Sequence, residues 1–319
     1  MKILVTGGAG FIGSHLIKKL IQQRHEVVAI DNLNAYYSPT LKKDRLNRFL
    51  DPKKFSFIKL DICDQAAVDK LFSQQEFQVI IHLAAMPGVR YSMNNPKIYE
   101  KINVQGSLNI FQAGVEQKIK KIIYASSSSV YSGNRKFPLA EADHIQEPLS
   151  FYGATKRALE LMANIYAHNY PIETIGLRYF TVYGPWGRPD LAYYQFVKKI
   201  IQGKPIDIHN QGQMSRSFTY IDDAIQGTMA VLQNQFSLGK NHLYNVGSER
   251  EVKLLDFIFL IQDLIGKEAH KNFINIQPGE AQRTKADNSK LKKLGWQSQV
   301  DLKQGMGEFI KWFRRYYEL

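Results

Sequence analysis

The chain has 319 residues, 44% of them hydrophobic, so it can bury a large core as two lobes or as one large domain. Its single cysteine, Cys63, excludes an internal disulfide and a cysteine-built metal site, and no apolar run approaches the ~20 residues that span a bilayer. The net charge of +13 is scattered over clusters at 42–48, 118–121 and 290–293 without interleaved aromatic residues, so we interpret them as solvated surface that favours an anionic small substrate.

The first strand begins at Lys2 and leaves no room for a signal peptide. We therefore expect a soluble, cytoplasmic protein without a membrane or nucleic-acid partner.

Short apolar strands alternate with helices over the first 180 residues. The expected strands are 2–7, 26–31, 55–61, 78–84, 121–127 and 173–180. The expected helices include 11–23, 96–117 and 151–169. Strands that are apolar on both faces and separated by helices predict an α/β fold with a Rossmann-type, doubly wound parallel sheet.

After residue 180 the pattern loosens into GPWGRPD, a helix near 191–202 and short strands. We expect residues 1–180 to form the Rossmann domain and residues 181–319 to form a smaller, interleaved, mixed α/β substrate-binding lobe. Two segments, near 217–228 and 242–265, are expected to return to the first domain.

The first strand leads into TGGAGFIG, residues 6–13. Gly7 permits the tight turn, Gly10 lets the backbone approach a pyrophosphate, and Gly13 lets the following helix pack closely on the strand. Because the three glycines lie between a strand and a helix, the motif predicts a dinucleotide site.

Carboxylates at two strand ends refine the choice of dinucleotide. Asp31 ends the second strand, where it can accept both hydroxyls of the adenine ribose and would repel a 2′-phosphate, so NAD is favoured over NADP. Asp61 ends the third strand and is a candidate for the adenine edge, although a helix cap is an equally good interpretation.

Residues 148–156 read PLSFYGATK and put Tyr152 and Lys156 on one helix face, four positions apart. A phenol has an ordinary pKa near 10, and an adjacent ammonium and a positive nicotinamide would favour the phenolate. Ser127, in SSSS at 126–129, can hydrogen-bond the same substrate oxygen. These three groups predict alcohol-to-ketone chemistry by hydride transfer to NAD.

Over essentially its whole length the sequence resembles the extended short-chain dehydrogenase/reductases, through TGGAGFIG, SSSSVY and YGATK. The stretches DNLNAYYS, GVRYS, LRYFTVYGPWGRPD and SFTYIDD look more specifically like UDP-glucuronate 4-epimerases, which interconvert UDP-glucuronate and UDP-galacturonate. The resemblance implies that Ser127, Tyr152 and Lys156 are catalytic and that the protein forms a homodimer through a four-helix bundle of helices 96–117 and 151–169.

The same resemblance implies contacts beyond the catalytic set. Those expected with the cofactor come from Gly7, Gly10, Phe11, Ile12, Gly13, Asp31, Asn32, Asp61, Ile62, Leu83, Ala84, Ala85, Asn103, Tyr152, Lys156, Tyr179 and Phe180. Those expected with the UDP-sugar come from Arg90, Ser127, Ser128, Thr181, Arg188 and Arg216. Arg216 is expected at the diphosphate, and Arg188 with Thr181 near C6 of the sugar. From spacing alone, a loop-stabilising salt bridge explains Arg188 equally well.

Three positions depart from the usual pattern: Ser132, the pair Met86 and Pro87, and Gln277. The first two touch the expected nicotinamide side. Gln277 stands where galactose-type enzymes carry a diphosphate-binding arginine, and Arg283 is a candidate substitute, with a solvated loop position equally plausible.

Three other functions compete with a uronic acid epimerase. A neutral or N-acetylated UDP-hexose 4-epimerase is the runner-up. A catalytically silent NAD-binding regulator would need none of Ser127, Tyr152 and Lys156. A dehydratase would need a carboxylate beside Ser127, where this chain has Ser128 and Ser129.

Overall fold

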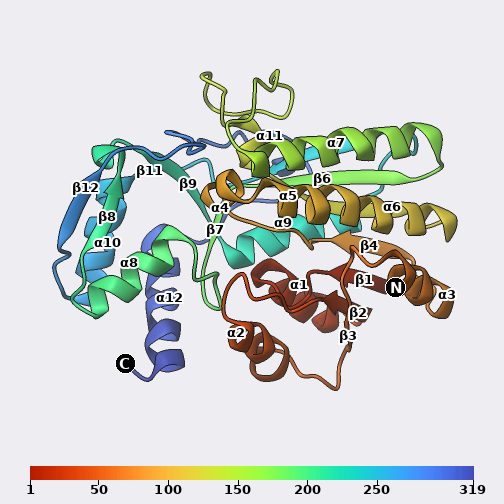
Figure 1. Cartoon of the computed structure of the whole chain (residues 1–319), viewed down its shortest axis with the longest axis horizontal. Coiled ribbons are helices and arrows are strands. Elements are labelled where there is room, and N and C mark those ends of the chain that lie inside the picture. The colour runs from red at the N-terminus through yellow and green to blue at the C-terminus, as the bar shows by residue number, and fades with distance from the viewer.

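The computed structural model describes residues 1–319 (Figure 1). Seven parallel strands form the main sheet in the order β10-β6-β5-β4-β1-β2-β3. Their bounds are β1 Lys2–Thr6, β2 Glu26–Asp31, β3 Ser56–Lys59, β4 Val79–His82, β5 Lys121–Ser127, β6 Glu173–Tyr179 and β10 Asn241–Val246. The predicted Rossmann-type fold is confirmed.

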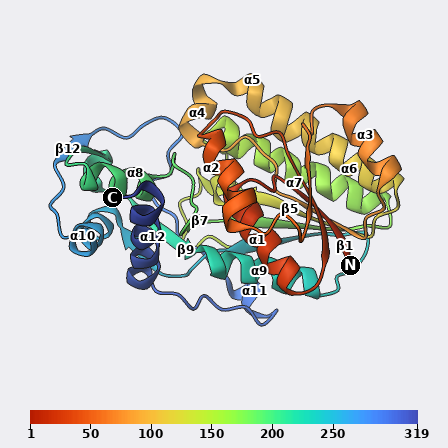
Figure 2. The ribbon, with the colours of Figure 1, turned by 90° about the horizontal axis from the view of Figure 1, so that it is seen from below.

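Alternating strand residues build one apolar core on each face of this sheet. In β1, Ile3 and Val5 pack into the core on the α1 side, whereas Leu4 packs into the core on the other side. Helices α1 (Phe11–Gln22) and α9 (Ile221–Gln233) cover the first face. Helices α3 (Gln65–Gln74), α6 (Gly106–Glu116) and α7 (Phe151–Asn169) cover the second, and Figure 2 shows the sheet between the two layers.

A smaller group of elements lies to one side of the main sheet, at the left of Figure 1. It contains a sheet in the order β11-β9-β7 and a parallel pair of β12 with β8. The strands are β7 Thr181–Tyr183, β8 Ile206–His209, β9 Ser215–Tyr220, β11 Glu251–Lys253 and β12 Lys271–Ile274. Its helices are α8 Ala192–Ile201, α10 Leu254–Ile265 and α12 Leu302–Tyr317.

Short helical segments connect these layers. They are α2 Pro39–Asp44, α4 Val89–Asn94, α5 Pro96–Tyr99 and α11 Ser289–Lys292, with π-helical turns η1 Arg45–Phe49 and η2 Glu100–Gln105 and single 3-10 turns η3 Ser128–Tyr131 and η4 Asn210–Gly212. The helix expected at 96–117 is therefore three successive pieces, α5, η2 and α6.

The returning segments are shorter than expected. Strand β10 joins the main sheet beside β6, and α9 packs against α1. Residues 217–220 instead belong to β9 in the smaller sheet, and within 242–265 β11 pairs with β9 while α10 packs against α8 and α12. The pattern of apolar residues could not reveal this because it specifies an element and not the neighbour on which it packs. No helix has the length and apolar character to cross a membrane.

Candidate active site

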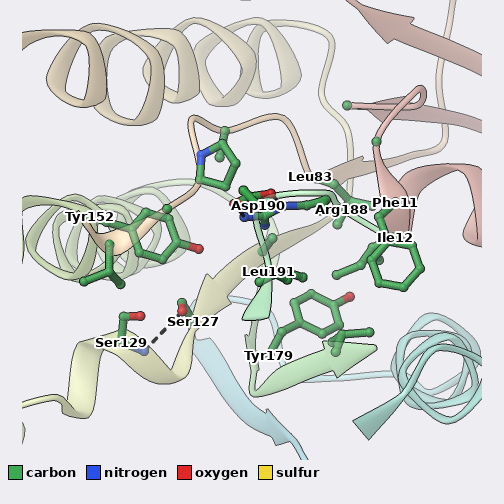
Figure 3. A pocket seen from close by; sticks show the side chains of 18 of the residues that line it. Phe11, Ile12, Leu83, Ser127, Ser129, Tyr152, Tyr179, Arg188, Asp190 and Leu191 are labelled. Atoms are coloured by element: carbon green, nitrogen blue, oxygen red, sulfur yellow. Dashed lines mark hydrogen bonds and ion pairs between the residues drawn. The ribbon is translucent and has the colours of Figure 1, made fainter. Parts of the chain in front are cut away.

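A cavity of about 740 Å³ opens at the carboxyl ends of the main strands, between the main sheet and the smaller group of elements. In open α/β sheets ligands bind at this edge, where the strand order reverses. Figure 3 shows side chains from both parts of the chain around it, including Tyr152, Tyr179, Arg188 and Phe11. All the predicted site residues line the cavity except Asn103.

The glycine motif forms a close-fitting turn between β1 and α1. Gly7 has φ +71°, and a Cβ on Gly13 would lie 2.2 Å from the Gly7 carbonyl oxygen, so neither position accepts a side chain. Gly10 caps α1, whose first turn has no acidic residue, so its unpaired backbone N–H groups point at the cavity with the positive end of the helix dipole. This arrangement fits a pyrophosphate.

Asp31 lies beside this turn and is held by the backbone. Its carboxylate accepts hydrogen bonds from the N–H groups of Ala9 (3.2 Å) and Leu33 (2.8 Å). Burial raises the pKa of Asp31, which these hydrogen bonds and the charge of Lys42 oppose. Asp61 accepts from the side chain of Asn32 and does not cap α3, a role taken by Asp64.

Lys42 corrects the surface interpretation of the 42–48 cluster. Its side chain is buried and lines the cavity, with the ammonium donating to the Asn34 carbonyl (2.8 Å) and side-chain oxygen (2.9 Å). Sequence reasoning missed it because α2 is too short for a periodic pattern to reveal a buried face.

Ser127 and Tyr152 face the same space, from the end of β5 and the first turn of α7 (Figure 3). The Ser127 hydroxyl oxygen accepts from the Ser129 N–H (3.1 Å), so its own proton is available to the Tyr152 oxygen or to a substrate oxygen in the cavity. Helix α7 starts where it does because the Ser150 side chain caps it through the Gly153 N–H (3.0 Å).

Lys156 is buried one turn further along α7 and donates to the Ala125 carbonyl (2.8 Å). Burial lowers the pKa of Lys156 to about 7. Burial raises the pKa of Tyr152, partly offset by the hydrogen bond with Ser127 and by the charge of Arg188. These protein groups alone therefore leave the phenol a weaker acid than usual.

Asn103 lies behind the cavity wall and is fully buried. Its side chain accepts from the Met86 N–H (2.6 Å) and donates to the Met86 carbonyl (3.1 Å) and the Thr155 hydroxyl (3.0 Å). With its hydrogen bonds made to Met86 and Thr155, Asn103 fixes the loop after β4 against α7, and it does not line the cavity. The π-helical turn η2 carries this residue inward.

Apolar and aromatic residues form part of the cavity lining. The apolar loop Leu83–Ala85 lines the cavity, as do Tyr179, the last residue of β6, and Phe180, which follows it. Tyr179 is tied by its hydroxyl to Thr228 (2.8 Å), and Phe180 packs against Val130 and Ala286, so both are core residues as well as cavity residues.

Arg188 lines the cavity from the loop after β7, together with Asp190, and Thr181 and Ser128 belong to the same lining. Asp190 binds the guanidinium through two contacts of 3.1 and 2.6 Å. Burial alone would lower the pKa of Arg188, but the charge and hydrogen bonds of Asp190 raise it, so the guanidinium stays charged.

Arg216 and Arg90 also line the cavity. Arg216 donates to the carbonyl groups of Ser215 (2.8 Å) and Ala281 (2.6 Å) and has no carboxylate partner, so burial lowers its pKa to about 10. Arg90 contacts Glu280 at 3.3 Å. Two cations in the lining fit a diphosphate.

The departures from the usual pattern have separate outcomes. The Ser132 hydroxyl lines the cavity and accepts from the Leu149 N–H (2.7 Å), and Pro87 lines it too while Met86 is buried. Gln277 lies outside the cavity lining. Arg283 also lies outside it, since it pairs with Glu251 (2.7 Å) and covers the Phe137 ring. It is therefore no substitute for the missing arginine.

Arg45 is the most informative residue that the sequence concealed. It is fully buried, yet no carboxylate pairs with it. Its guanidinium donates to the carbonyls of Ala9 (3.0 Å), Trp186 (2.7 and 2.9 Å) and Gly187 (3.0 Å) and to the hydroxyl of Tyr37 (2.7 Å). It thus ties the dinucleotide turn to the loop that carries Arg188.

A glycine turn, the Asp31 carboxylate at the end of β2 and a Ser-Tyr-Lys set around one cavity of a Rossmann sheet are typical of dinucleotide-dependent enzymes of the extended short-chain dehydrogenase/reductase type. Residues 3–247 match the model of the NAD dependent epimerase/dehydratase family. The chain belongs to this family, and its cofactor is NAD, as predicted.

Individual relatives cover nearly the whole chain. A probable UDP-glucuronate 4-epimerase of Rhizobium meliloti is 39% identical over 99% of this chain and 98% of its own. The UDP-glucuronic acid 4-epimerase of Bacillus cereus, solved with UDP-glucuronic acid and NAD, has a TM-score of 0.93 at 37% identity and covers 99% and 100% of the two chains. The UDP-glucose 4-epimerase of Thermotoga maritima, solved with UDP-glucose, has a TM-score of 0.90 at 28% identity with the same coverage.

Proposed function

We propose that this chain is a UDP-glucuronate 4-epimerase, which interconverts UDP-glucuronate and UDP-galacturonate through a transient 4-keto sugar. The coarser activity, NAD-dependent 4-epimerisation of a UDP-sugar, is common to the solved relatives with uronic acid and with neutral sugar. One observation favours the uronic acid: a charged Arg188 lies in the cavity with Tyr152, close enough for its charge to act on the phenol.

Tyr152 is the group that removes the proton from the sugar 4-hydroxyl. Ser127 donates a hydrogen bond from its hydroxyl to the same oxygen without transferring the proton, and its orientation by the Ser129 N–H supports this role. When bound, NAD takes up the hydride from C4 and returns it. Because burial raises the pKa of Tyr152, base chemistry requires the positive nicotinamide and a charged Lys156 to lower it again.

Lys156 can bind the cofactor and remain charged beside Tyr152. Its ammonium is buried and held by Ala125, so a cofactor ribose placed against it gains a charged hydrogen bond. The same contact favours the charged form of Lys156, whose pKa burial has lowered to about 7.

The carboxylate of the substrate needs its own partner. Removing the C4 hydride leaves a ketone two carbons from the C6 carboxylate, and such a β-keto acid loses carbon dioxide when the C5–C6 bond aligns with the carbonyl π system. Arg188, with the hydroxyls of Thr181 and Ser128, can hold the carboxylate out of that alignment. The sugar must also turn over between the two hydride transfers, so this grip has to serve two orientations.

The nucleotide end is assigned by charge. Arg216 is without a carboxylate partner and is aimed by backbone carbonyls, which suits it to the diphosphate, with Arg90 as a second contact.

Two further expectations remain predictions. The first is the domain division: we expect residues 1–180 to bind NAD on the main sheet, and residues 181–319 to form the lobe that closes the sugar site. The homodimer is supported by exposed apolar side chains on the expected helices, Leu108 on α6 and Leu161 and Ile165 on α7.

The test is to incubate the purified protein with UDP-glucuronate, UDP-glucose and UDP-N-acetylglucosamine in separate samples and to follow each sugar by NMR. Conversion of UDP-glucuronate at least ~10-fold faster than the others supports the proposal. That ratio is the expected contribution of one charged pair between Arg188 and the substrate carboxylate, which the neutral sugars cannot form. Faster conversion of a neutral sugar favours the runner-up, and no turnover of any sugar favours a regulator.

A further inference from the structure

Arg188 already has a partner before any substrate arrives. Asp190 contacts the side of the guanidinium, with Nε to Oδ1 at 3.1 Å and Nη2 to Oδ2 at 2.6 Å. Asp190 is itself held by a second residue of the cavity lining, because the Tyr36 hydroxyl donates to its Oδ2 at 3.3 Å. Tyr36 comes from the loop after β2 and Asp190 from the loop after β7, so this contact joins two cavity-lining loops that are far apart in sequence.

A guanidinium offers a carboxylate two edges, one formed by Nε and Nη2 and one by the two terminal nitrogens. Asp190 uses the first edge, whereas Nη1 makes no hydrogen bond within the protein. The terminal edge is therefore open for a second carboxylate. Arg188 and Asp190 are each about one-quarter exposed, which places the pair at the cavity surface and not in the core.

We propose that Asp190, steadied by Tyr36, is a positioning residue that presents the terminal edge of Arg188 to the C6 carboxylate and weakens its grip by cancelling its charge. This inference rests on the proposed function. The physical basis is the charge count. Arg188 and Asp190 together carry no net charge when a neutral sugar binds, whereas the three groups carry one net negative charge when a uronate binds.

A weakened grip suits a reaction in which the sugar turns over. An unpaired, desolvated guanidinium would hold the carboxylate strongly in one orientation and slow the turn that precedes hydride return. With Asp190 present, the carboxylate can leave and rejoin the arginine without exposing an uncompensated cation.

The experiment compares Asp190→Asn with wild type by calorimetric binding of UDP-glucuronate and UDP-glucose and by kcat. The amide keeps the shape of Asp190 and removes its charge. We expect UDP-glucuronate to bind about three- to tenfold more tightly, UDP-glucose to bind within about twofold of wild type, and kcat on UDP-glucuronate to fall about tenfold. A purely structural role predicts weaker binding of both sugars, and that result, or unchanged uronate affinity, overturns the inference.

Two further variants separate charge from geometry. Tyr36→Phe keeps the Asp190 charge, so uronate affinity should stay within about twofold of wild type while the fraction of decarboxylated pentose rises. Tightening as large as that in Asp190→Asn would overturn the charge argument. The matched control is Asp207→Asn, an exposed carboxylate paired with Lys199 outside the cavity, which should match wild type in both assays.

A double variant tests whether Asp190 acts through the arginine. In an Arg188→Ala background, Asp190→Asn should no longer lower kcat on UDP-glucuronate, since no arginine remains to hold the carboxylate. A retained tenfold fall in kcat contradicts the inference. The proposed function fails separately, if wild type makes no UDP-galacturonate; the inference alone fails if wild type does so and Asp190→Asn behaves identically.

Discussion

The two ends of the cavity are encoded differently. At the dinucleotide end, Gly7, Gly10 and Gly13 act within a single strand-to-helix turn, and Asp31 ends the adjacent strand. At the sugar end, Tyr36 and Arg188 meet through Asp190 although far apart in sequence. Local geometry therefore specifies the first site, whereas the second exists only once the whole chain has folded.

The largest expected effect lies where the two ends meet. Tyr152→Phe removes the proton acceptor that both sugar and cofactor face, so turnover should fall by about 10²- to 10⁴-fold while NAD remains bound. Turnover by NMR and cofactor content by absorbance after gel filtration check the two halves separately. A near-native rate in this variant would remove the phenol from the mechanism.

Arg188→Ala tests the sugar end alone. Losing a charge-assisted pair costs about 1.5–3 kcal/mol, roughly a 10- to 100-fold loss of kcat/KM on UDP-glucuronate, with a much smaller change on UDP-glucose and some pentose released. The assay is NMR with both sugars. Equal losses on both would mean that Arg188 does not bind the carboxylate.

Arg45 joins the two ends of the cavity, so its removal should affect both the stability of the fold and the preference for the uronate. Arg45→Met leaves the carbonyls of Ala9, Trp186 and Gly187 unpaired and should lower the free energy of unfolding by about 2–4 kcal/mol, with a partial loss of preference for the uronate. Arg48→Met, in the same turn but with 60% of the side chain exposed, should change stability by less than about 0.5 kcal/mol in urea unfolding. Equal stability of the two variants would contradict the bridging role.

The last effect is confined to the pH dependence of stability without cofactor. The pKa of Lys156 is about 7 in the folded chain against an ordinary 10.5, so between these values the unfolded chain binds the proton and the folded chain does not. Stability from this group should therefore rise as pH increases from about 7 towards 10.5. Lys156→Met lacks the rise, and urea unfolding at pH 7, 8 and 9 should show wild type gaining on the variant. Parallel curves would show that Lys156 is not desolvated.

Much of the fold could be predicted from the sequence, because the spacing of apolar residues and the glycine turns specify helices and strands from neighbouring residues alone. The strands at 26–31 and 121–127 and the helix at 151–169 have their predicted bounds. Ser127, Tyr152, Lys156 and Asp31 share one cavity because parallel strands end at one edge.

The rest depended on partners that no local pattern specifies. The sequence pattern predicted Arg45 to be a solvated charge, but it is buried and donates to carbonyl groups far away in the sequence. Arg283 was a candidate for a diphosphate, but it is paired with Glu251. Asn103 was expected at the cofactor, yet Met86 and Thr155 use its side chain. Charge and spacing identify a polar group, while its direction comes from tertiary contacts.

The most direct test of the central claim is to run the reaction in deuterated water with no added NAD and to follow C4 of the product by NMR. Hydride removed to the bound cofactor and returned from it never exchanges with solvent. We predict that UDP-glucuronate gives UDP-galacturonate with protium retained at C4. Deuterium at C4, or no UDP-galacturonate, would contradict the account.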